Sequence, residues 1–318
     1  MKRFYLSLCI FVLVSLEVSA QFPMRPPRQQ KIDPIVQQMI DEETHHSQLK
    51  IIAHELMDKI GPRLVGTSKM LQANDWAVNK YKSWGIEARN EKWGEWRGWE
   101  RGITHIDMIS PWVRTLEGTQ LAWSPSTQGK TVTGEVIILP DLSDSLSYAK
   151  WAPSVKGKFV MVSAEQPTGR SDANWKEFGT EASIAKMNHE RDSLLRAWNQ
   201  RISKTGFTSK TLPAMLEKAG AAGILTNYWS KGFGVDKIFG ANTKNIPTVD
   251  ISLEDYGLVY RLVQNGTPVK LNIQADSRET GVALDFGQNM GDVERIGERQ
   301  RRGIDLAAAD YARLLRPV

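Results

Sequence analysis

The segment LPAMLEKAGAAGILT, residues 212–226, indicates the fold class of this 318-residue chain. Its first half predicts a short helix over Leu212–Lys218, and its last residues predict a buried strand over Ile224–Thr226. The small residues between them, AGAAG, allow a helix and a strand to pack closely. A helix that leads directly into a buried strand is typical of α/β proteins.

Strands are predicted on both sides of this segment. VTGEVIIL (132–139), KFVMV (158–162) and IPTVDI (246–251) have the composition of short buried strands. The charged, proline-free segment 175–202 favours a long helix. These elements extend the α/β arrangement over the middle of the chain.

The module ends with one more helix and strand. Ser252, followed three residues later by Asp255, is typical of a capping box at a helix start. We expect this helix to end near Gly266, after which alternating apolar residues over 269–273 predict a final strand.

The chain before this module predicts three helices. The first begins at Asp33-Pro34, the second is capped by Thr44 or Ser47 and ends at Gly61-Pro62, and the third covers 68–84. A tryptophan-rich stretch follows, with Trp93, Trp96, Trp99, Trp112 and Trp123. We expect strands with large packing faces there. Stacking of these rings on sugars or peptides is the alternative.

The first twenty residues predict export. Lys2 and Arg3 precede an apolar run from Phe4 to Leu16, and Val18-Ser19-Ala20 supplies the small residues that signal peptidase requires before Gln21. A membrane anchor is the alternative, but the run is short for a bilayer span and is interrupted at Glu17. A cleaved signal peptide implies a secreted, periplasmic or cell-surface location. Residues 21–32 predict a flexible lead-in.

Cysteine content and charge exclude several classes of function. The single cysteine, Cys9, lies in the signal peptide, which excludes disulfides, thiolate metal sites and cysteine nucleophiles from the mature chain. The net charge of +5 comes largely from the signal peptide and the C-terminal arginines, so we predict no nucleic-acid partner. No later apolar stretch is long enough to predict a membrane span.

Two short motifs resemble patterns of metal ligands. His54-Glu55-Leu56-Met57-Asp58 begins like the HExxH motif, but Asp58 replaces the second histidine, so a polar edge of a helix is favoured. His105-Ile106-Asp107 has the H-x-D spacing, which places both side chains on one face of a strand. No acidic pair follows it, so an ordinary strand histidine is favoured. The other histidines are His45, His46 and His189.

Motifs for other chemistry are weak. The chain has no G-x-S-x-G, P-loop or G-x-G-x-x-G motif, and its two S-x-x-K matches, at Ser47 and Ser147, are short enough to arise by chance. From the residues we therefore predict no catalytic and no metal-binding residue in this chain. The substrate-binding residues cannot be assigned from the sequence.

The order of the segments resembles that of a known enzyme family. IGPRLVGTS (60–68), placed between two predicted helices, resembles the start of secreted zinc exopeptidases of the carboxypeptidase Q type, and more distantly of aminopeptidases S and Y. The middle module is similar to the protease-associated domain that these enzymes carry as an insertion. The matching segments are 155–160, 219–224, 246–252 and 266–269.

The resemblance covers about residues 33–279 and implies a domain plan. After the signal peptide (1–20) and the lead-in (21–32), residues 33–110 form the N-terminal part of an α/β peptidase domain. Residues 111–275 form the inserted protease-associated domain, a mixed sheet with flanking helices. Residues 276–318 are a return segment and a divergent, disordered tail, rich in arginine and without lysine.

The resemblance implies an exported, zinc-dependent exopeptidase of aminopeptidase or dipeptidase type that acts on peptides. In the family, two zinc ions bind to residues that follow the inserted domain, including an H-x-D motif and a Glu-Glu pair. Neither motif occurs in the 39 residues after Glu279. We therefore expect a fragment, truncated or frameshifted near codon 280, that binds no zinc and is inactive alone. We also expect its stable middle module to be flanked by poorly packed ends, with apolar helix faces from Leu49 to Tyr81 exposed.

The alternative is a genuine short protein without catalytic activity. In that case the protease-associated module would bind peptides or glycans outside the cell.

Overall fold

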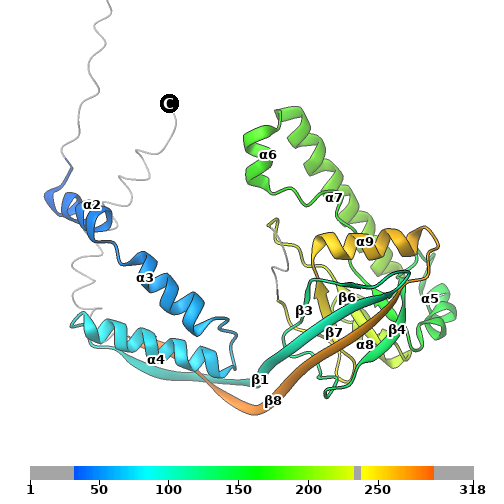
Figure 1. Ribbon diagram of the computed structural model, residues 1–318, viewed down its shortest axis with the longest axis horizontal. Coiled ribbons are helices and arrows are strands. Elements are labelled where there is room, and N and C mark those ends of the chain that lie inside the picture. Colours follow the sequence, from blue (N-terminus) through cyan, green and yellow to red (C-terminus); the bar gives the residue numbers. More distant parts are fainter. Residues whose placement is uncertain (1–31, 233–237, 290–318) are drawn as a thin grey trace, which may run out of the picture. The chain divides into compact units, whose positions relative to one another are not determined.

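The computed structural model describes residues 32–232 and 238–289 (Figure 1). The chain divides into two compact units, Met1–Lys59 and Ile60–Val318. The predicted signal peptide, nearly all of the lead-in, and the tail from residue 290 onward lie outside the described residues.

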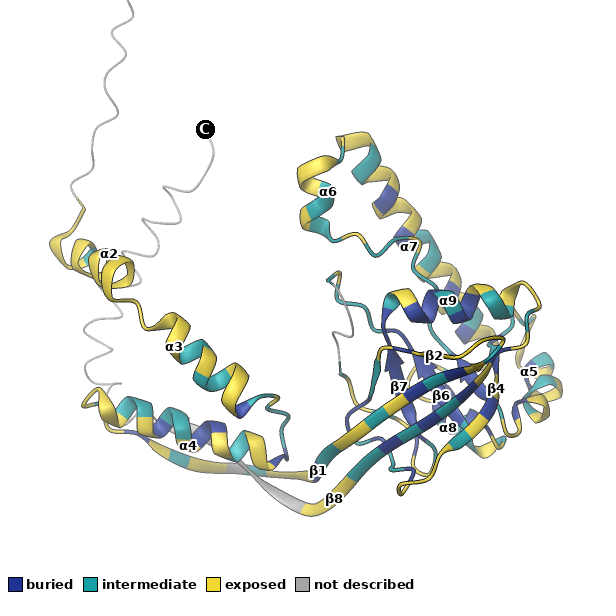
Figure 2. Cartoon of the chain, in the orientation of Figure 1, coloured by how far each residue is buried: buried dark blue, intermediate teal, exposed yellow. Residues whose placement is uncertain are grey.

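The described part of the first unit, from Ile32 to Lys59, forms exposed helices. Helix α2 (Pro34–His46) begins as predicted, because the Asp33 carboxylate accepts a hydrogen bond from Ile35 N at 2.8 Å. Helix α3 (Leu49–Ala53) continues into a π-helix, η1 (His54–Ile60), which the sequence did not predict. No residue from Ile32 to Lys59 is buried (Figure 2), so the exposure expected from Leu49 onward is confirmed as far as Lys59. The most exposed apolar side chains are Ile32, Ile35, Met39, Leu49, Ile51 and Met57.

The second unit begins with α4 (Ser68–Ser83), which packs against strands β1 (Arg89–Ser110) and β8 (Lys270–Asn289). Thr67 caps this helix, and Val78 is buried. The expectation that apolar faces stay exposed as far as Tyr81 is therefore wrong for α4. The reason is that the paired strands β1 and β8 cover its apolar side.

One eight-stranded mixed sheet runs through this unit, in the order β2-β1-β8-β4-β5-β6-β7-β3. Strands β4 (Val132–Ile138), β5 (Phe159–Met161), β6 (Gly223–Thr226) and β7 (Thr248–Ile251) are parallel to one another. The antiparallel pairs are β1 with β2 (Arg114–Thr115), β1 with β8, β8 with β4, and β7 with β3 (Gly118–Gln120). The predicted α/β class is confirmed.

The core lies around the parallel strands. Every residue of β5, β6 and β7 is buried, and because successive side chains point to opposite faces, both faces of these strands are covered. The connecting helices are α5 (Ser145–Trp151), the 3₁₀ turn η2 (Ala152–Val155), α6 (Asp172–Phe178), α7 (Glu181–Lys204), α8 (Leu212–Lys218) and α9 (Leu253–Gln264). Their apolar residues in the core include Tyr148, Trp198, Ile202, Leu216, Tyr256 and Val259.

The predicted long helix over 175–202 is divided in two. Helices α6 and α7 are separated at Gly179, whose position leaves no room for a side chain: an added Cβ would lie 2.6 Å from Trp175 O. Ser171 and Thr180 each cap one of the two helices. The caps were visible in the sequence, and the prediction gave too much weight to helix propensity.

The final strand is much longer than predicted. The expected strand over 269–273 becomes β8, which pairs with β1 from Ser110↔Lys270 to Arg89↔Asn289. The pairing continues past Glu279 because β1 offers a partner along its whole length. Four register shifts interrupt it.

The tryptophan-rich stretch is only partly buried. It contains strand β1, as predicted, and Trp99 is 2% exposed, but Trp96 and Trp112 are 47% and 46% exposed. The expectation that these tryptophans form the packing faces of strands is therefore wrong for Trp96 and Trp112. Within the described ranges, no helix has the length and apolar character needed to cross a membrane.

Candidate functional site

The structure places the HExxD string on an exposed helical surface. His54 Nδ1 lies 2.8 Å from Asp58 Oδ2, and the two side chains are 56% and 68% exposed. One turn of η1 separates them, so the motif forms a local contact between two side chains at the surface.

The H-x-D string lies on β1, with the alternation that the sequence predicts. Ile106 is buried, whereas His105 on the opposite face is exposed and Asp107 is partly exposed. Asp107 Oδ1 accepts a hydrogen bond from Thr115 Oγ1 at 2.8 Å, which joins β1 to β2. His105 and Asp107 therefore share one face of β1, and the Asp107 carboxylate already has a hydrogen-bond partner, Thr115, within the fold.

The described residues do not fit a zinc site. Nowhere in 32–232 or 238–289 do three or more His, Cys, Asp or Glu side chains gather closely enough to hold a metal ion. His45 Nδ1 contacts Asp41 O and His46 Nδ1 contacts Glu42 Oε2, each at 3.0 Å within their own helix. A zinc site requires three or four such donors that converge on one point.

A buried polar cluster lies where the parallel strands end, a feature that the sequence analysis missed. This edge of an α/β sheet commonly binds ligands. The Tyr256 hydroxyl donates to Ser163 O at 2.7 Å and accepts from Ser163 N at 2.9 Å. Asn227 N donates to Ser163 Oγ at 3.0 Å, and Asn227 Nδ2 donates to Ile251 O at 2.8 Å. The signal in the sequence was the polar residue that follows each buried strand.

Asp250 completes this cluster. Its Oδ1 accepts hydrogen bonds from Thr226 Oγ1 at 2.9 Å and from Tyr228 N at 2.8 Å. Burial raises the pKa of Tyr228, and the charge of Asp250 raises it further. Burial also raises the pKa of Tyr256 well above its ordinary value, so both phenols stay protonated. The cluster therefore joins the strand ends through satisfied hydrogen bonds.

The predicted capping box at α9 is only half formed. Ser252 Oγ accepts from Asp255 N at 3.4 Å, as the motif requires. The Asp255 carboxylate, however, accepts from Arg114 at 2.7 Å and from Glu117 N at 2.7 Å. Ser252 N donates to Glu117 O at 2.9 Å. The reciprocal bond is lost because Arg114 of β2 supplies a guanidinium for the carboxylate, and Glu117, between β2 and β3, supplies the acceptor for Ser252 N.

A buried cation joins α6, α7 and the loop after β6. Arg191, 5% exposed, pairs with Asp172 Oδ1 at 2.9 Å and lies 4.7 Å from the ring centroid of Trp229. Lys231 contacts Asp172 Oδ2 at 2.9 Å, and its hydrogen bond is the main reason why the pKa of Asp172 is lowered. Arg191 Nη1 and Nη2 both have acceptors, Asp172 Oδ1 and Arg170 O, whereas the buried Arg191 Nε has no hydrogen-bond partner among the described residues. These contacts tie the two helices and the loop together.

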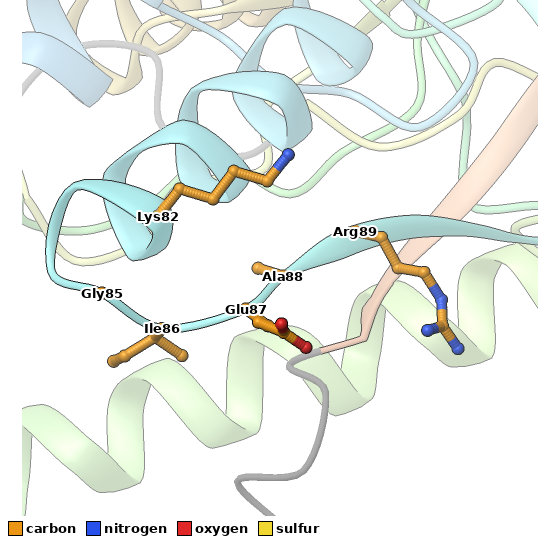
Figure 3. Close-up of a pocket in the computed structure, with 6 residues that line it drawn as sticks. All are labelled: Lys82, Gly85, Ile86, Glu87, Ala88 and Arg89. Carbon is orange, nitrogen blue, oxygen red and sulfur yellow. The ribbon is translucent and has the colours of Figure 1, made fainter.

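An open cavity of about 460 Å³ lies at the turn between α4 and β1 (Figure 3). It is lined by Lys82, Gly85, Ile86, Glu87, Ala88 and Arg89. Figure 3 shows the Lys82 side chain extending above the strand and the Arg89 side chain extending below it. Because its charged groups do not converge, this cavity lacks the arrangement of a catalytic site.

No family model and no curated protein sequence matches the chain. Among solved structures, it is similar to a peptidase M28 precursor from Shewanella amazonensis SB2B, with a TM-score of 0.51 and 19% identity. The match covers 80% of this chain and 52% of that one. The two proteins share a fold. The chain thus spans about half the length of the Shewanella peptidase, and the predicted resemblance is confirmed at the level of the fold.

Two further solved structures are more distant. An aminopeptidase from Aneurinibacillus sp. strain AM-1 has a TM-score of 0.37 at 13% identity, over 74% of this chain and 45% of that one. A zinc aminopeptidase from Bacillus subtilis has a TM-score of 0.41 at 14% identity, over 74% of this chain and 44% of that one.

Proposed function

We propose that the chain is the front, insert-bearing part of an exported zinc-dependent exopeptidase of aminopeptidase or dipeptidase type. The observation that supports this most strongly is the fold shared with the Shewanella peptidase over 80% of the chain. The segment 60–68 and the predicted signal peptide support the family and the export. Peptides are the proposed substrates.

The strand pairing supports the proposed domain plan. A domain inserted into a host sheet must leave and re-enter the host at neighbouring positions. The chain leaves β1 at Ser110 and returns at Lys270, and these two residues are partners in the β1–β8 pairing. The elements from β2 to α9 lie between them, which matches the proposed protease-associated domain over 111–275.

We propose that this chain does not hydrolyse peptides by itself. The part of the chain that the structure describes offers no converging set of zinc donors. Residues 290–318 contain neither histidine nor a Glu-Glu pair. No hydrolytic step is therefore assigned to residues of this chain.

Metal analysis and an activity assay test this proposal. We expect the purified mature chain, dialysed against zinc, to bind far less than one zinc per chain and to leave leucine p-nitroanilide intact. A heat-denatured sample of the same chain is the control. Stoichiometric zinc together with hydrolysis that a chelator abolishes would overturn the proposed inactivity.

The second candidate is a non-catalytic module that binds peptides or glycans outside the cell. The apolar core of the second unit favours this candidate. This core is built from described residues and extends from Ile106 of β1 to Ala275 of β8. Screening the purified chain against panels of peptides and oligosaccharides tests it. Absence of saturable binding in both panels would rule it out.

A further inference from the structure

A second cavity, of about 440 Å³, opens beside β1 and is lined by Glu95, Trp96, Arg97 and Gly281. Its volume lies within the range of small-ligand pockets. Three of the four lining residues are consecutive on β1, and Gly281 lies on the paired strand β8. The cavity is therefore built on regular secondary structure.

One indole ring, that of Trp96, lines this cavity, and the ring of Trp123 lies against it. Trp96, 47% exposed, lies with its ring centroid 6.0 Å from that of Trp123 at an interplanar angle of 58°. Trp123 Nε1 donates to Arg97 O at 3.2 Å, which holds its ring against β1. Its backbone has φ = 56°, a left-handed conformation that is unusual for a bulky residue. Strained residues of this kind occur often at binding sites.

Arg97 supplies a positive charge at the cavity. Its guanidinium carbon lies 5.6 Å from the ring centroid of Trp123, which orients the group. Among the described carboxylates, none lies within ion-pairing distance of Arg97. The neighbouring Glu95 pairs with Lys92 at 2.8 Å. The guanidinium thus has donors that suit a ligand carboxylate.

The edge of β1 that leads away from the cavity toward Arg89 can accept another strand. From Arg89 to Arg101, β1 pairs with β8 alone among the described strands. Trp99 N donates to Gly66 O and Arg97 O accepts from Trp123 Nε1, each at 3.2 Å, so the open part of the edge runs from Arg89 to Glu95. An unpaired strand edge is a common site for an extended peptide, with a nearby pocket that takes one side chain.

We propose that this cavity binds peptides, with an apolar side chain against Trp96 and the C-terminal carboxylate on Arg97. The rest of the peptide extends along the free edge of β1. The inference rests on the proposed function only in taking peptides as the ligand, and it requires neither zinc nor hydrolysis. A peptide is favoured over a glycan because it matches both the strand edge and the charge of Arg97.

Calorimetry on the full mature chain tests the site with the tetrapeptide Gly-Leu-Phe-Leu and its C-terminal amide. We expect saturable binding of the free acid and about tenfold weaker binding of the amide, because the amide has no carboxylate for Arg97. Trp96→Ala should weaken binding of the acid by at least about tenfold. Trp112→Ala is the matched control, since Trp112 is 46% exposed and Trp96 is 47% exposed.

Two further variants separate the role of charge from a loss of folding. Arg97→Gln should remove the preference for the acid over the amide, and Arg97→Lys should restore part of it. Trp96→Phe keeps an aromatic ring and should retain most of the affinity, and the thermal midpoint of each variant reports whether it folds. No saturable peptide binding, equal losses in the two tryptophan variants, or Trp96-dependent binding of an oligosaccharide instead would each overturn the proposal. A finding of zinc binding or of peptide hydrolysis would overturn only the proposed inactivity of the chain, and it would leave the peptide site at Trp96 and Arg97 untouched.

Discussion

Asp255 joins the start of α9 to β2 and to the segment that follows it through one carboxylate. The side chain is 6% exposed, and its oxygens accept from Arg114 and from Glu117 N. These partners lie 141 and 138 residues away in the sequence. A single residue therefore connects two segments that local sequence patterns treat separately.

Replacing this carboxylate should destabilise the fold. We expect Asp255→Ala to lower the free energy of unfolding by about 2 kcal/mol, because Glu117 N and the guanidinium of Arg114 lose a charged acceptor. Urea unfolding followed by circular dichroism measures the change. Asp141→Ala is the control, since Asp141 pairs with Lys204 at the surface, with side chains 57% and 41% exposed. If both variants shift the urea midpoint equally, the contribution of Asp255 does not come from its buried pairing.

At the scale of elements, the connection between η1 and α4 contacts β1 at Gly66. Gly66 has φ = 81°, and a Cβ at this position would overlap Arg97 O. Its own carbonyl accepts from Trp99 N at 3.2 Å. The turn thus lies directly against the strand edge, and only glycine permits both the conformation and the approach.

A pair of glycine variants separates these two effects. We expect Gly66→Ala to lower the free energy of unfolding by about 2–3 kcal/mol, because a left-handed backbone and a steric overlap both oppose the new side chain. Gly61→Ala should lower the free energy of unfolding by about 1 kcal/mol, because only the left-handed backbone opposes the new side chain there. Gly61 has almost the same φ, 82°, and no atom within 4 Å of an added Cβ. Chemical denaturation of both variants provides the comparison, and equal losses would show that the contact with Arg97 is unimportant.

At the scale of the whole molecule, burial is unevenly distributed between the two units. The residues from Ile32 to Lys59 bury no side chain, whereas the second unit has one continuous core from Ile106 to Ala275. Because burial of apolar surface supplies most of the stability, the helices of the first unit should open far more often than the sheet.

Limited proteolysis should reveal this difference. Trypsin at low concentration should cut after Lys50 and Lys59 and leave a resistant product that begins at Ile51 or Ile60. Intact mass and N-terminal sequencing identify the product. An equally resistant product that begins near residue 33 would contradict the expectation, because it would show that α2 and α3 are as protected as the core.

Local chemistry in the sequence determined much of the fold. Apolar runs predicted the parallel strands, and capping residues such as Asp33 and Ser252 marked helix starts that the structure confirms. The H-x-D string on β1 also has the face predicted from strand alternation. These features depend on neighbours within a few residues, which is why the sequence by itself was sufficient.

The tertiary structure alone decided the features that depend on distant partners. The length of β8 follows from β1, the carboxylate of Asp255 turns to Arg114 and Glu117, and Trp96 meets Trp123 beside a cavity. In each case a local motif was outweighed by a group brought from far along the chain. A charged hydrogen bond or a continuous strand partner stabilises more than the local alternative, and neither is visible before the chain folds.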